Sequence, residues 1–258
     1  MDNTNTIILA FTGKGGVGKT SLSAACVRLL AQAYPDKKIL AIDADPAVGL
    51  ATALGTDTVL TVDDIRKSFV AEAEKGNTGA AIELLGEAKY RMFDAVTEKG
   101  NVSFIAIGRP ESSGCYCKVN AYLKEIISMI AGNYDFVIID GEAGIEQVNR
   151  RVMEKVTHLI LVSDASIKGL QVIKTIHSVA EEMMMFDRAG IIINRIPDMS
   201  LAGSFDTGNL ELLSMIPDDR DMVMNDVRGD DIYSLPESSP LFGGAETALI
   251  KLGLIQGE

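Results

Sequence analysis

Short apolar runs alternate along the chain with longer stretches whose apolar positions recur at helical spacing. The runs that predict buried strands are residues 6–11, 38–42, 102–107, 136–140, 158–162, 190–194 and 212–216. The stretches that predict helices are residues 21–32, 119–131, 168–185 and 245–252. Strands that alternate with helices in this way are typical of a doubly wound α/β fold, in which a mainly parallel sheet is flanked by helices.

Residues 56–100 are the least regular part of the pattern. Their apolar positions indicate amphipathic helices with charged outer faces, interrupted at Asn77-Thr78-Gly79. The positions that define this spacing are Ile65, Phe69, Ile82, Leu85, Met92 and Val96. We expect these helices to pack on the sheet. The alternative is a lid or a partner-binding face.

The composition is that of an ordinary globular protein. The chain has 258 residues, of which 47% are hydrophobic, and we expect one domain over residues 1–258. Its formal net charge of −12 argues against non-specific attraction to nucleic acid or to an anionic membrane. No apolar run approaches the roughly 20 residues of a membrane span, and the polar start does not resemble a signal peptide. We therefore expect a cytoplasmic protein with neither nucleic acid nor membrane as a partner.

The segment Gly13-Lys14-Gly15-Gly16-Val17-Gly18-Lys19-Thr20 lies between the first predicted strand and the first predicted helix. It fits the P-loop pattern, whose glycines let backbone N–H groups turn inward on nucleotide phosphates. Lys19 is expected to reach the β- and γ-phosphates, and the Thr20 hydroxyl to bind Mg²⁺. The predicted nucleotide contacts are Gly13, Gly15, Gly16, Val17, Gly18, Lys19, Thr20 and Ser21. The alternative is a glycine-rich turn that binds nothing, but the flanking strand and helix favour the P-loop.

Carboxylates follow two other predicted strands. Asp43 and Asp45 come at the end of residues 38–42, and Asp140 closes the run that starts at Phe136. The carboxyl ends of parallel strands meet at the edge of the sheet where ligands bind, so these groups are candidates to face the phosphates. Asp140 is expected to hold Mg²⁺ through a water, as a Walker B carboxylate does. The alternative for Asp43 and Asp140 is a capping or turn-forming role.

Three cysteines occur, and two of them, Cys115 and Cys117, are separated by one residue. Two thiolates leave a soft metal ion half coordinated, but a symmetric dimer would supply four sulfurs, enough for Zn²⁺ or Ni²⁺. The alternative is two small residues in a loop without a metal. Cys26 lies on the apolar face of the first predicted helix and is interpreted as a buried core residue.

Lys14 adds a family resemblance, because a plain P-loop needs no lysine after its first glycine. The motif resembles the deviant P-loop of the MinD and nitrogenase iron protein class of ATPases. The resemblance implies that Lys14 reaches the nucleotide of the partner subunit and that Asp45 orients the attacking water. It also implies that Asn194 reads the adenine edge, with Arg195 and Pro217 beside the base.

A closer resemblance rests on Gly114-Cys115-Tyr116-Cys117 with Asn120, and on the segment Asp140-Gly141-Glu142-Ala143-Gly144-Ile145-Glu146. These residues resemble the CooC-type ATPases that mature carbon monoxide dehydrogenase by nickel insertion. The resemblance implies a nucleotide-dependent homodimer that holds a metal ion on paired Cys-x-Cys motifs and releases it to a client enzyme. The iron proteins carry Asp at the position of Gly144, and its absence here favours the metal-insertion family over an iron–sulfur electron donor. They also carry Asp at the position of Gly49, so the resemblance does not supply a second Mg²⁺-linked carboxylate from this loop.

The resulting hypothesis is a dimeric ATPase in which Lys14, Lys19, Asp45 and Asp140 serve hydrolysis. The closing of the dimer would set the geometry of Cys115 and Cys117. Three alternatives stay open: a positioning or partition ATPase, an iron–sulfur reductase component, and a structural Zn²⁺ site that only joins the dimer.

Overall fold

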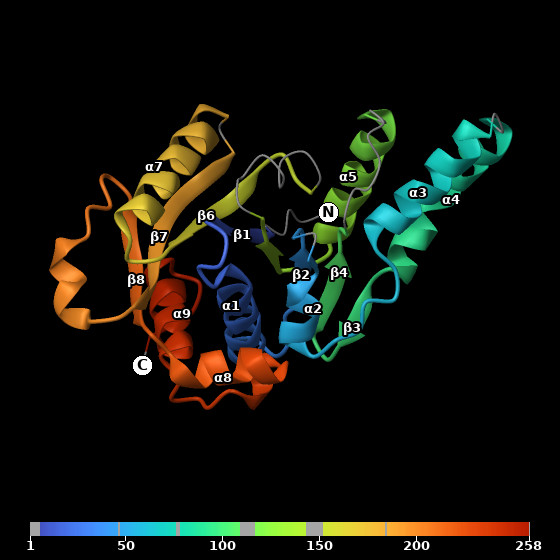
Figure 1. The fold of residues 1–258 in the computed structure, drawn as a ribbon. Helices are drawn as coiled ribbons and strands as arrows, with labels where there is room; N and C mark the ends of the chain where they lie inside the picture. Colours follow the sequence, from blue (N-terminus) through green and yellow to red (C-terminus); the bar gives the residue numbers. More distant parts are fainter. Residues whose placement is uncertain are drawn as a thin grey trace.

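The computed structural model describes residues 6–45, 47–75, 78–108, 117–142, 152–183 and 185–257, without the side chains of 73–74, 78–85 and 117–120. These residues form an eight-stranded sheet (Figure 1). Its strands are β1 (Ile7–Gly13), β2 (Ile39–Asp43), β3 (Thr97–Lys99), β4 (Val102–Ala106), β5 (Phe136–Asp140), β6 (Val156–Ser163), β7 (Phe186–Ile196) and β8 (Glu211–Pro217). Their order in space is β3-β4-β2-β5-β1-β6-β7-β8.

The sheet is parallel except at β3, which pairs antiparallel with β4. β1, the first strand in the chain, lies in the middle, between β5 and β6. The chain therefore winds outward from β1 in both directions, and ligands of such sheets bind at the carboxyl ends of the strands where the direction reverses. The predicted α/β fold with a mainly parallel sheet is confirmed.

Helices cover both faces of this sheet. α1 (Lys19–Ala33), α2 (Gly49–Leu54) and α9 (Pro240–Lys251) pack on one face, and α5 (Cys117–Ala131) and α7 (Ile167–Glu182) pack on the other (Figure 1). The strands serve both layers because successive side chains point to opposite faces. In β1, Leu9 and Phe11 join the core under α1, whereas Ala10 joins the core under α5 and α7.

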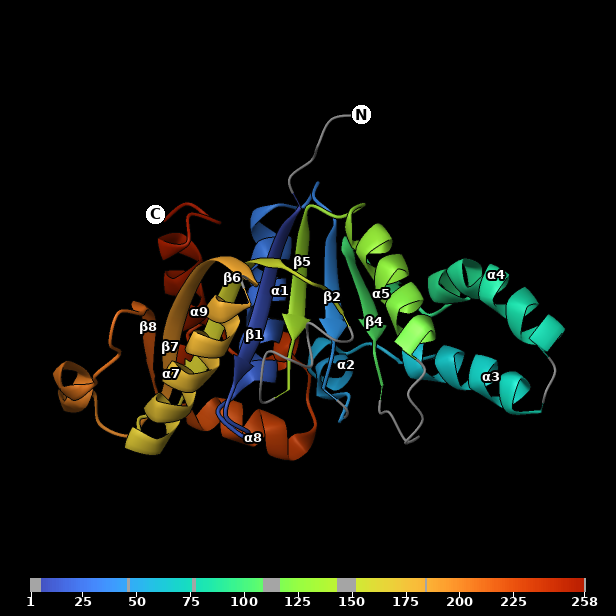
Figure 2. The same ribbon diagram turned by 90° about the horizontal axis from the view of Figure 1, so that it is seen from above.

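Residues 56–100 contain α3 (Val62–Glu74) and α4 (Thr78–Asp94), followed by β3. The prediction of helices is confirmed, but they form a hairpin that extends beyond the β3 edge of the sheet (Figure 2). The base of the hairpin joins the core through Ile65, Phe69 and Met92. The expected packing of both helices on the sheet is therefore corrected. The two helices contact each other and α5.

The sequence pattern did not predict α2 or α8 (Arg220–Arg228). α8 nevertheless has clear capping signals: the Asp219 carboxylate accepts hydrogen bonds from the N–H groups of Asp221 and Met222, and Gly229 ends the helix at φ 70°. α9 begins earlier than predicted because Ser239 caps it before Pro240. No helix in the described part of the chain has the length and apolar character of a membrane span.

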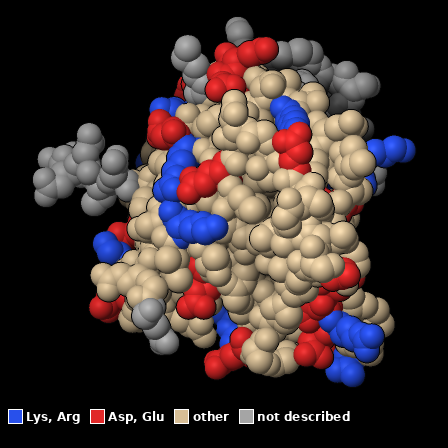
Figure 3. Space-filling model, turned by 90° about the vertical axis from the view of Figure 1, so that its left-hand side faces the viewer, with Lys and Arg blue, Asp and Glu red and all other residues tan. Residues whose placement is uncertain are grey.

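β8 lies at one edge of the sheet, and Figure 3 shows the face of the molecule on this side. Lys and Arg residues there are interspersed with Asp and Glu, and the middle of the face carries other residues. Lys251 Nζ donates a hydrogen bond to the carbonyl oxygen of Leu212 at 2.8 Å, and Pro217 at the end of the strand has no N–H group. Both features protect this edge against pairing with another strand.

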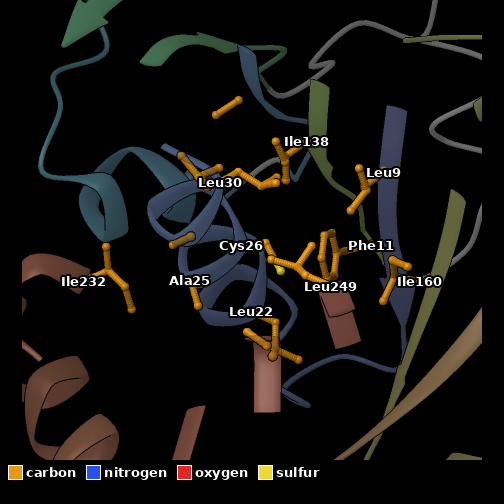
Figure 4. Close-up of a cluster of buried hydrophobic side chains, with 14 of the residues drawn as sticks. Leu9, Phe11, Leu22, Ala25, Cys26, Leu30, Ile138, Ile160, Ile232 and Leu249 are labelled. Atoms are coloured by element: carbon orange, nitrogen blue, oxygen red, sulfur yellow. The ribbon is translucent and has the colours of Figure 1, made fainter. Parts of the chain in front are cut away.

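Phe11 is 1% exposed and packs among side chains of the α1 layer such as Leu22, Cys26 and Leu249 (Figure 4). We expect Phe11→Ala to lower the free energy of unfolding by about 3–5 kcal/mol, since it leaves a cavity between β1 and α1. The control Phe93→Ala, at a 49% exposed position of α4, should cost less than about 1 kcal/mol. Urea unfolding followed by circular dichroism measures both values, and equal losses would contradict this placement of the core.

Candidate functional site

The P-loop begins at the end of β1 and closes at the first turn of α1. Gly16 and Gly18 have φ values of 78° and 93°, in the left-handed region that favours glycine. A Cβ atom on Gly18 would lie 2.5 Å from Nδ2 of Asn194, and one on Gly13 would lie 2.0 Å from the carbonyl oxygen of Val162. Gly18 caps α1 without a side-chain hydrogen bond, so the first N–H groups of the helix stay available to an anion.

The Lys19 side chain is buried and folds back over this loop. Its Nζ donates hydrogen bonds to the carbonyl oxygens of Gly13 at 3.3 Å and Lys14 at 3.2 Å. These two carbonyls hold the ammonium group against the loop. A phosphate cradled by the backbone N–H groups of the same loop would therefore meet this charge.

Two buried carboxylates stand side by side at the ends of neighbouring strands. Asp43 ends β2, Asp140 ends β5, and the two residues are register partners. Burial, reinforced by the charge of Asp140, raises the pKa of Asp43 to about 7. Burial also raises the pKa of Asp140 to about 6, although the Thr20 hydroxyl and the Lys19 charge oppose the rise. The pair therefore favours a cation at this position.

Asp140 retains the coordination capacity that a metal ion needs. Its Oδ1 accepts a long hydrogen bond from Ser23 Oγ at 3.4 Å, while its buried Oδ2 has no hydrogen-bond partner among the described residues. Mg²⁺, a hard cation that prefers oxygen ligands, fits this carboxylate together with the Thr20 hydroxyl. The described residues contain no group of three or more His, Cys, Asp or Glu that could hold a metal ion. Mg²⁺ at this site would thus share its coordination with phosphate and water.

The loop after β2 is tied to Asp43 at both ends. Asp43 Oδ1 accepts a hydrogen bond from the Asp45 N–H at 3.0 Å, and Oδ2 accepts one from the Leu50 N–H at 2.8 Å. The Asp45 carboxylate in turn accepts a hydrogen bond from the Ala47 N–H at 2.9 Å. Asp43 therefore has the turn-forming role that was one of its two interpretations, and it sets the position of the loop that carries Asp45.

Two residues of the same loop bear on its ability to switch. Val48 has a φ of 51°, a conformation strained for a β-branched residue, and such strain is often found at switch segments. A Cβ atom on Gly49 would lie 3.5 Å from Cγ2 of Thr20. The position at which the iron proteins carry an Asp thus faces Thr20, and this chain offers no carboxylate there.

Lys14 forms an ion pair within its own chain. Its Nζ lies 3.1 Å from Oδ2 of Asp164, which directly follows β6. Burial alone would raise the pKa of Asp164, but hydrogen bonds from Ser166 and Lys14 hold it below its usual value. Sequence reasoning did not give Asp164 this role, although a carboxylate after a strand beside β1 was the available signal. The expected contact of Lys14 with a partner subunit requires this ion pair to open.

Asn194 and Arg195, which were expected beside the base, both bond to the P-loop. Asn194 Nδ2 donates to the carbonyl oxygen of Val17 at 2.9 Å, and Arg195 Nη1 donates to that of Gly16 at 2.8 Å. Both residues also line a hollow of about 310 Å³ next to the start of α1. Their N–H groups thus bond to the P-loop itself, and their contact with the base stays a prediction.

Pro217, which was also expected beside the base, does not line that hollow, and its contact with the base stays a prediction. It lines a separate groove of about 390 Å³ at the β8 edge, whereas its neighbours Ile216 and Asp218 line the hollow beside the P-loop. The reason is the alternation of side chains along a strand, which places positions 216 and 218 on the face opposite to 217.

The Cys-x-Cys motif falls largely outside the described residues. Cys115 is not described, and Cys117 begins α5 with a side chain that is not described. The strand that leads into this loop is described: the Ile107 N–H donates to the carbonyl oxygen of Asp43 at 2.8 Å. The carbonyl oxygen of Ile107 accepts from the N–H of Asp63, in the first turn of α3, at 2.9 Å. The described strand therefore ends beside Asp43, two residues before the segment that is not described.

Two other sequence interpretations have different outcomes. Cys26 is buried, and burial raises the pKa of its thiol to about 12, so its interpretation as an inert core residue is confirmed. Gly144, whose departure from the iron proteins was noted, lies outside the described residues.

Comparisons with known proteins agree with this geometry. The sequence profile of the AAA domain family matches residues 5–186, which is more than half of the chain. The chain belongs to this family. It is a P-loop ATPase. ATP or ADP with Mg²⁺ are the expected ligands of the P-loop and the neighbouring carboxylates.

Individual relatives of this AAA-domain ATPase have more specific names. An uncharacterized ATP-binding protein of Methanocaldococcus jannaschii is 32% identical over 250 residues, covering 95% of this chain and 98% of the relative. The carbon monoxide dehydrogenase accessory protein CooC of Rhodospirillum rubrum is 29% identical over 220 residues, covering 76% and 82%. The septum site-determining protein MinD of Pyrococcus horikoshii, solved with Mg-ADP, superposes with a TM-score of 0.70 at 24% identity and 96% coverage of both chains. This last likeness shows the fold.

The raised pKa of Asp43 predicts how stability depends on pH. The folded chain holds this proton up to about pH 7, whereas the ordinary value is 3.8, so the free energy of unfolding should fall as the pH rises between these values. We expect a fall on the order of 2–4 kcal/mol without ligands, and a clearly smaller fall in Asp43→Asn. Urea unfolding from pH 4.5 to 8 measures it. The control Asp135→Asn, which removes a carboxyl whose pKa is lowered by Lys37, should keep the fall. An unchanged slope in Asp43→Asn would refute the assignment.

The ion pair between Lys14 and Asp164 predicts a gain of activity. Asp164→Asn should free Lys14 and so raise ATP turnover at protein concentrations where dimerisation limits the rate. The expected gain is about 2- to 5-fold, which corresponds to the free energy of one partly exposed ion pair. Lys14→Ala should abolish the gain when combined with it. The control Asp206→Asn breaks the exposed ion pair with Lys174 and should leave turnover unchanged. A phosphate-release assay over a range of protein concentrations provides the rates, and a fall in Asp164→Asn would contradict the autoinhibitory pairing.

Proposed function

We propose that this AAA-domain ATPase is a metallochaperone. It acts as a homodimer that couples ATP hydrolysis to the transfer of nickel to a metalloenzyme such as carbon monoxide dehydrogenase. The metal ion is held between two chains by Cys115 and Cys117 of each. Support comes from the Cys-x-Cys motif and from the similarity to a protein named as an accessory factor of carbon monoxide dehydrogenase.

One observation carries the proposal. The hydrogen bond from Ile107 to the carbonyl oxygen of Asp43 joins the strand that enters the Cys-x-Cys loop to the residue that anchors the loop after β2. A change in the position of Asp43 or of its loop would therefore reach the start of the cysteine segment directly. This adjacency gives the nucleotide a short physical route to the geometry of the metal-binding thiolates.

The residues of the site divide the work of hydrolysis. The P-loop N–H groups and Lys19 hold the phosphates, and Thr20 with Asp140 would hold Mg²⁺, which neutralises phosphate charge when it is bound. Asp45 orients the attacking water. Lys14 leaves Asp164 and reaches the nucleotide of the partner, where a positive charge stabilises the transition state.

The transfer of the metal follows from the two states of the dimer. With ATP bound, the closed dimer brings the two Cys-x-Cys loops together, and four thiolates complete the coordination of Ni²⁺. Hydrolysis removes the γ-phosphate contacts that hold the dimer closed, so the thiolates separate and their affinity for the metal falls. The client then takes the ion.

A positioning or partition ATPase is the second candidate, because the chain shares its fold with MinD. That function uses the same nucleotide switch but needs no thiolates. An iron–sulfur reductase component and a purely structural Zn²⁺ site would both need the cysteines. These alternatives differ in which metal is bound and in its response to the nucleotide.

The test is anaerobic metal binding by the full chain, measured by elemental analysis together with oligomeric mass, with ADP, with ATP and without nucleotide. We expect about one Ni²⁺ per two chains, lost in Cys115→Ser/Cys117→Ser and retained in the matched thiol control Cys26→Ala. Release should accelerate on hydrolysis. Cysteine-independent binding would overturn the proposal. Bound Zn²⁺ whose amount does not change with the nucleotide would favour a structural site. Visible absorbance from iron would favour an iron–sulfur cluster.

A further inference from the structure

The end of β7 holds the P-loop through two neighbouring side chains. Asn194 Nδ2 donates a hydrogen bond to the carbonyl oxygen of Val17 at 2.9 Å, and Arg195 Nη1 donates one to that of Gly16 at 2.8 Å. The bonded residues are 177 and 179 positions apart in the sequence. One strand end therefore fixes two consecutive peptide groups of a loop that begins the chain's first helix.

The direction of these two hydrogen bonds determines where the loop's own donors point. A trans peptide group is planar, so its C=O and N–H bonds point in opposite directions. The Gly16 carbonyl shares a peptide group with the Val17 N–H, and the Val17 carbonyl shares one with the N–H of Gly18. Because Arg195 and Asn194 hold both carbonyls toward β7, the two N–H groups point away from β7. Backbone N–H groups of such a loop are the groups that cradle phosphates.

The P-loop needs this support because of its composition. Four of its eight residues, from Gly13 to Thr20, are glycines, and glycine loses more conformational freedom on ordering than any other residue. Lys19 holds the carbonyl oxygens at the start of the loop, those of Gly13 and Lys14. The next carbonyls that side chains hold are the two bonded to β7. A loop that is ordered in advance binds its ligand more tightly, since no further ordering opposes binding.

Arg195 has a backbone conformation that is unusual for an arginine. Its φ is 56°, in the left-handed region that glycine adopts easily and other residues rarely. Arg195 is also exposed, so burial in the core does not account for its side chain. A strained backbone of this kind is often found at functional sites. Together with the hydrogen bond to Gly16, it indicates that the guanidinium group has a use at this position.

We propose that Arg195 is a positioning residue for phosphate binding. Together with Asn194, it holds the Gly16 and Val17 peptide groups so that the loop's N–H groups are aimed before the nucleotide binds. This role differs from a contact with the base, because it acts on the phosphates alone. The inference rests on the nucleotide-binding part of the proposed function and is independent of metal transfer.

The test compares Mg-ADP with magnesium pyrophosphate by calorimetry in the full chain. Both ligands bind through the P-loop, but only Mg-ADP carries a nucleoside. Arg195→Ala should weaken both by the same factor, about 3- to 10-fold, as expected for the loss of an exposed hydrogen bond from a charged group. Arg228→Ala is the matched control, because it removes the same charge from the exposed last turn of α8, and it should leave both affinities unchanged.

A second variant separates positioning from a role in stability. Glycine suits the φ of 56° and alanine does not, so Arg195→Gly should unfold at a higher urea concentration than Arg195→Ala. Both variants lack the hydrogen bond to Gly16, so both should lose the same factor in affinity for ADP and for pyrophosphate. A side chain that served stability alone would instead make the affinity follow the urea midpoint.

Direct attraction between the guanidinium group and the phosphates is the competing explanation, and salt distinguishes it. Such attraction is screened by salt, so its loss in Arg195→Ala would matter less at high ionic strength. The hydrogen bond to Gly16 acts within the protein. We therefore expect the ratio of wild-type to variant affinity to stay constant between about 0.05 and 0.5 M salt.

Four outcomes would overturn the inference. Unchanged affinities in Arg195→Ala would show that the P-loop needs no support from this side chain. A loss for ADP alone would assign Arg195 to the nucleoside. Recovery of affinity in Arg195→Gly would reduce the role to stability, and a loss that disappears at high salt would assign it to direct attraction. A wild-type chain that binds neither ligand would contradict the nucleotide part of the proposed function, whereas one that binds both but no nickel contradicts metal transfer alone.

Discussion

The adjacency of Asp43 and Asp140 is the constraint on which the rest of the site depends. Two carboxylates occupy one register position of neighbouring parallel strands, below a loop that presents an ammonium group. Burial opposes the ionisation of both carboxyl groups. The backbone hydrogen bonds to Asp43 and the Lys19 charge near Asp140 offset this effect of burial only in part. The arrangement therefore favours a cation next to the carboxylates and a polyphosphate next to the ammonium group.

Asp43 also connects the site to neighbouring segments of the chain. Asp43 uses its carboxylate to hold the loop after β2 and its carbonyl oxygen to hold Ile107, and Ile107 in turn holds the start of α3. The loop after β2, the end of the strand at Ile107 and the first turn of α3 are thus joined through Asp43 and Ile107. This arrangement brings Ile107, at the end of the described strand before the cysteine segment, and the start of the α3–α4 hairpin next to Asp43, although the sequence separates these segments widely.

Local patterns predicted the fold and the phosphate site well, and long-range geometry poorly. The P-loop and Asp140 were found because a glycine-rich turn between strand and helix, and a carboxylate after an apolar run, are signals contained within a few residues. The ion pair of Lys14 with Asp164 spans two loops that only the pairing of β1 with β6 brings together. α8 was not predicted because periodicity assumes that apolar residues face the core, whereas Val223, Met224 and Val227 of this helix are exposed.

The position of α9 has a consequence for the order in which the molecule can fold during synthesis. Side chains of α9, including Leu241, complete the core into which α1 and β1 are packed. Leu249 is another, and it lies near Cys26 and Phe11 (Figure 4). The P-loop follows β1, yet the layer that supports it is closed by α9, far later in the sequence. A domain in which two such distant elements share a core cannot finish folding on the ribosome until both have been synthesised. Nucleotide binding thus requires α9 as well as the P-loop, and a chain whose synthesis stops before α9 would carry the motif without the site.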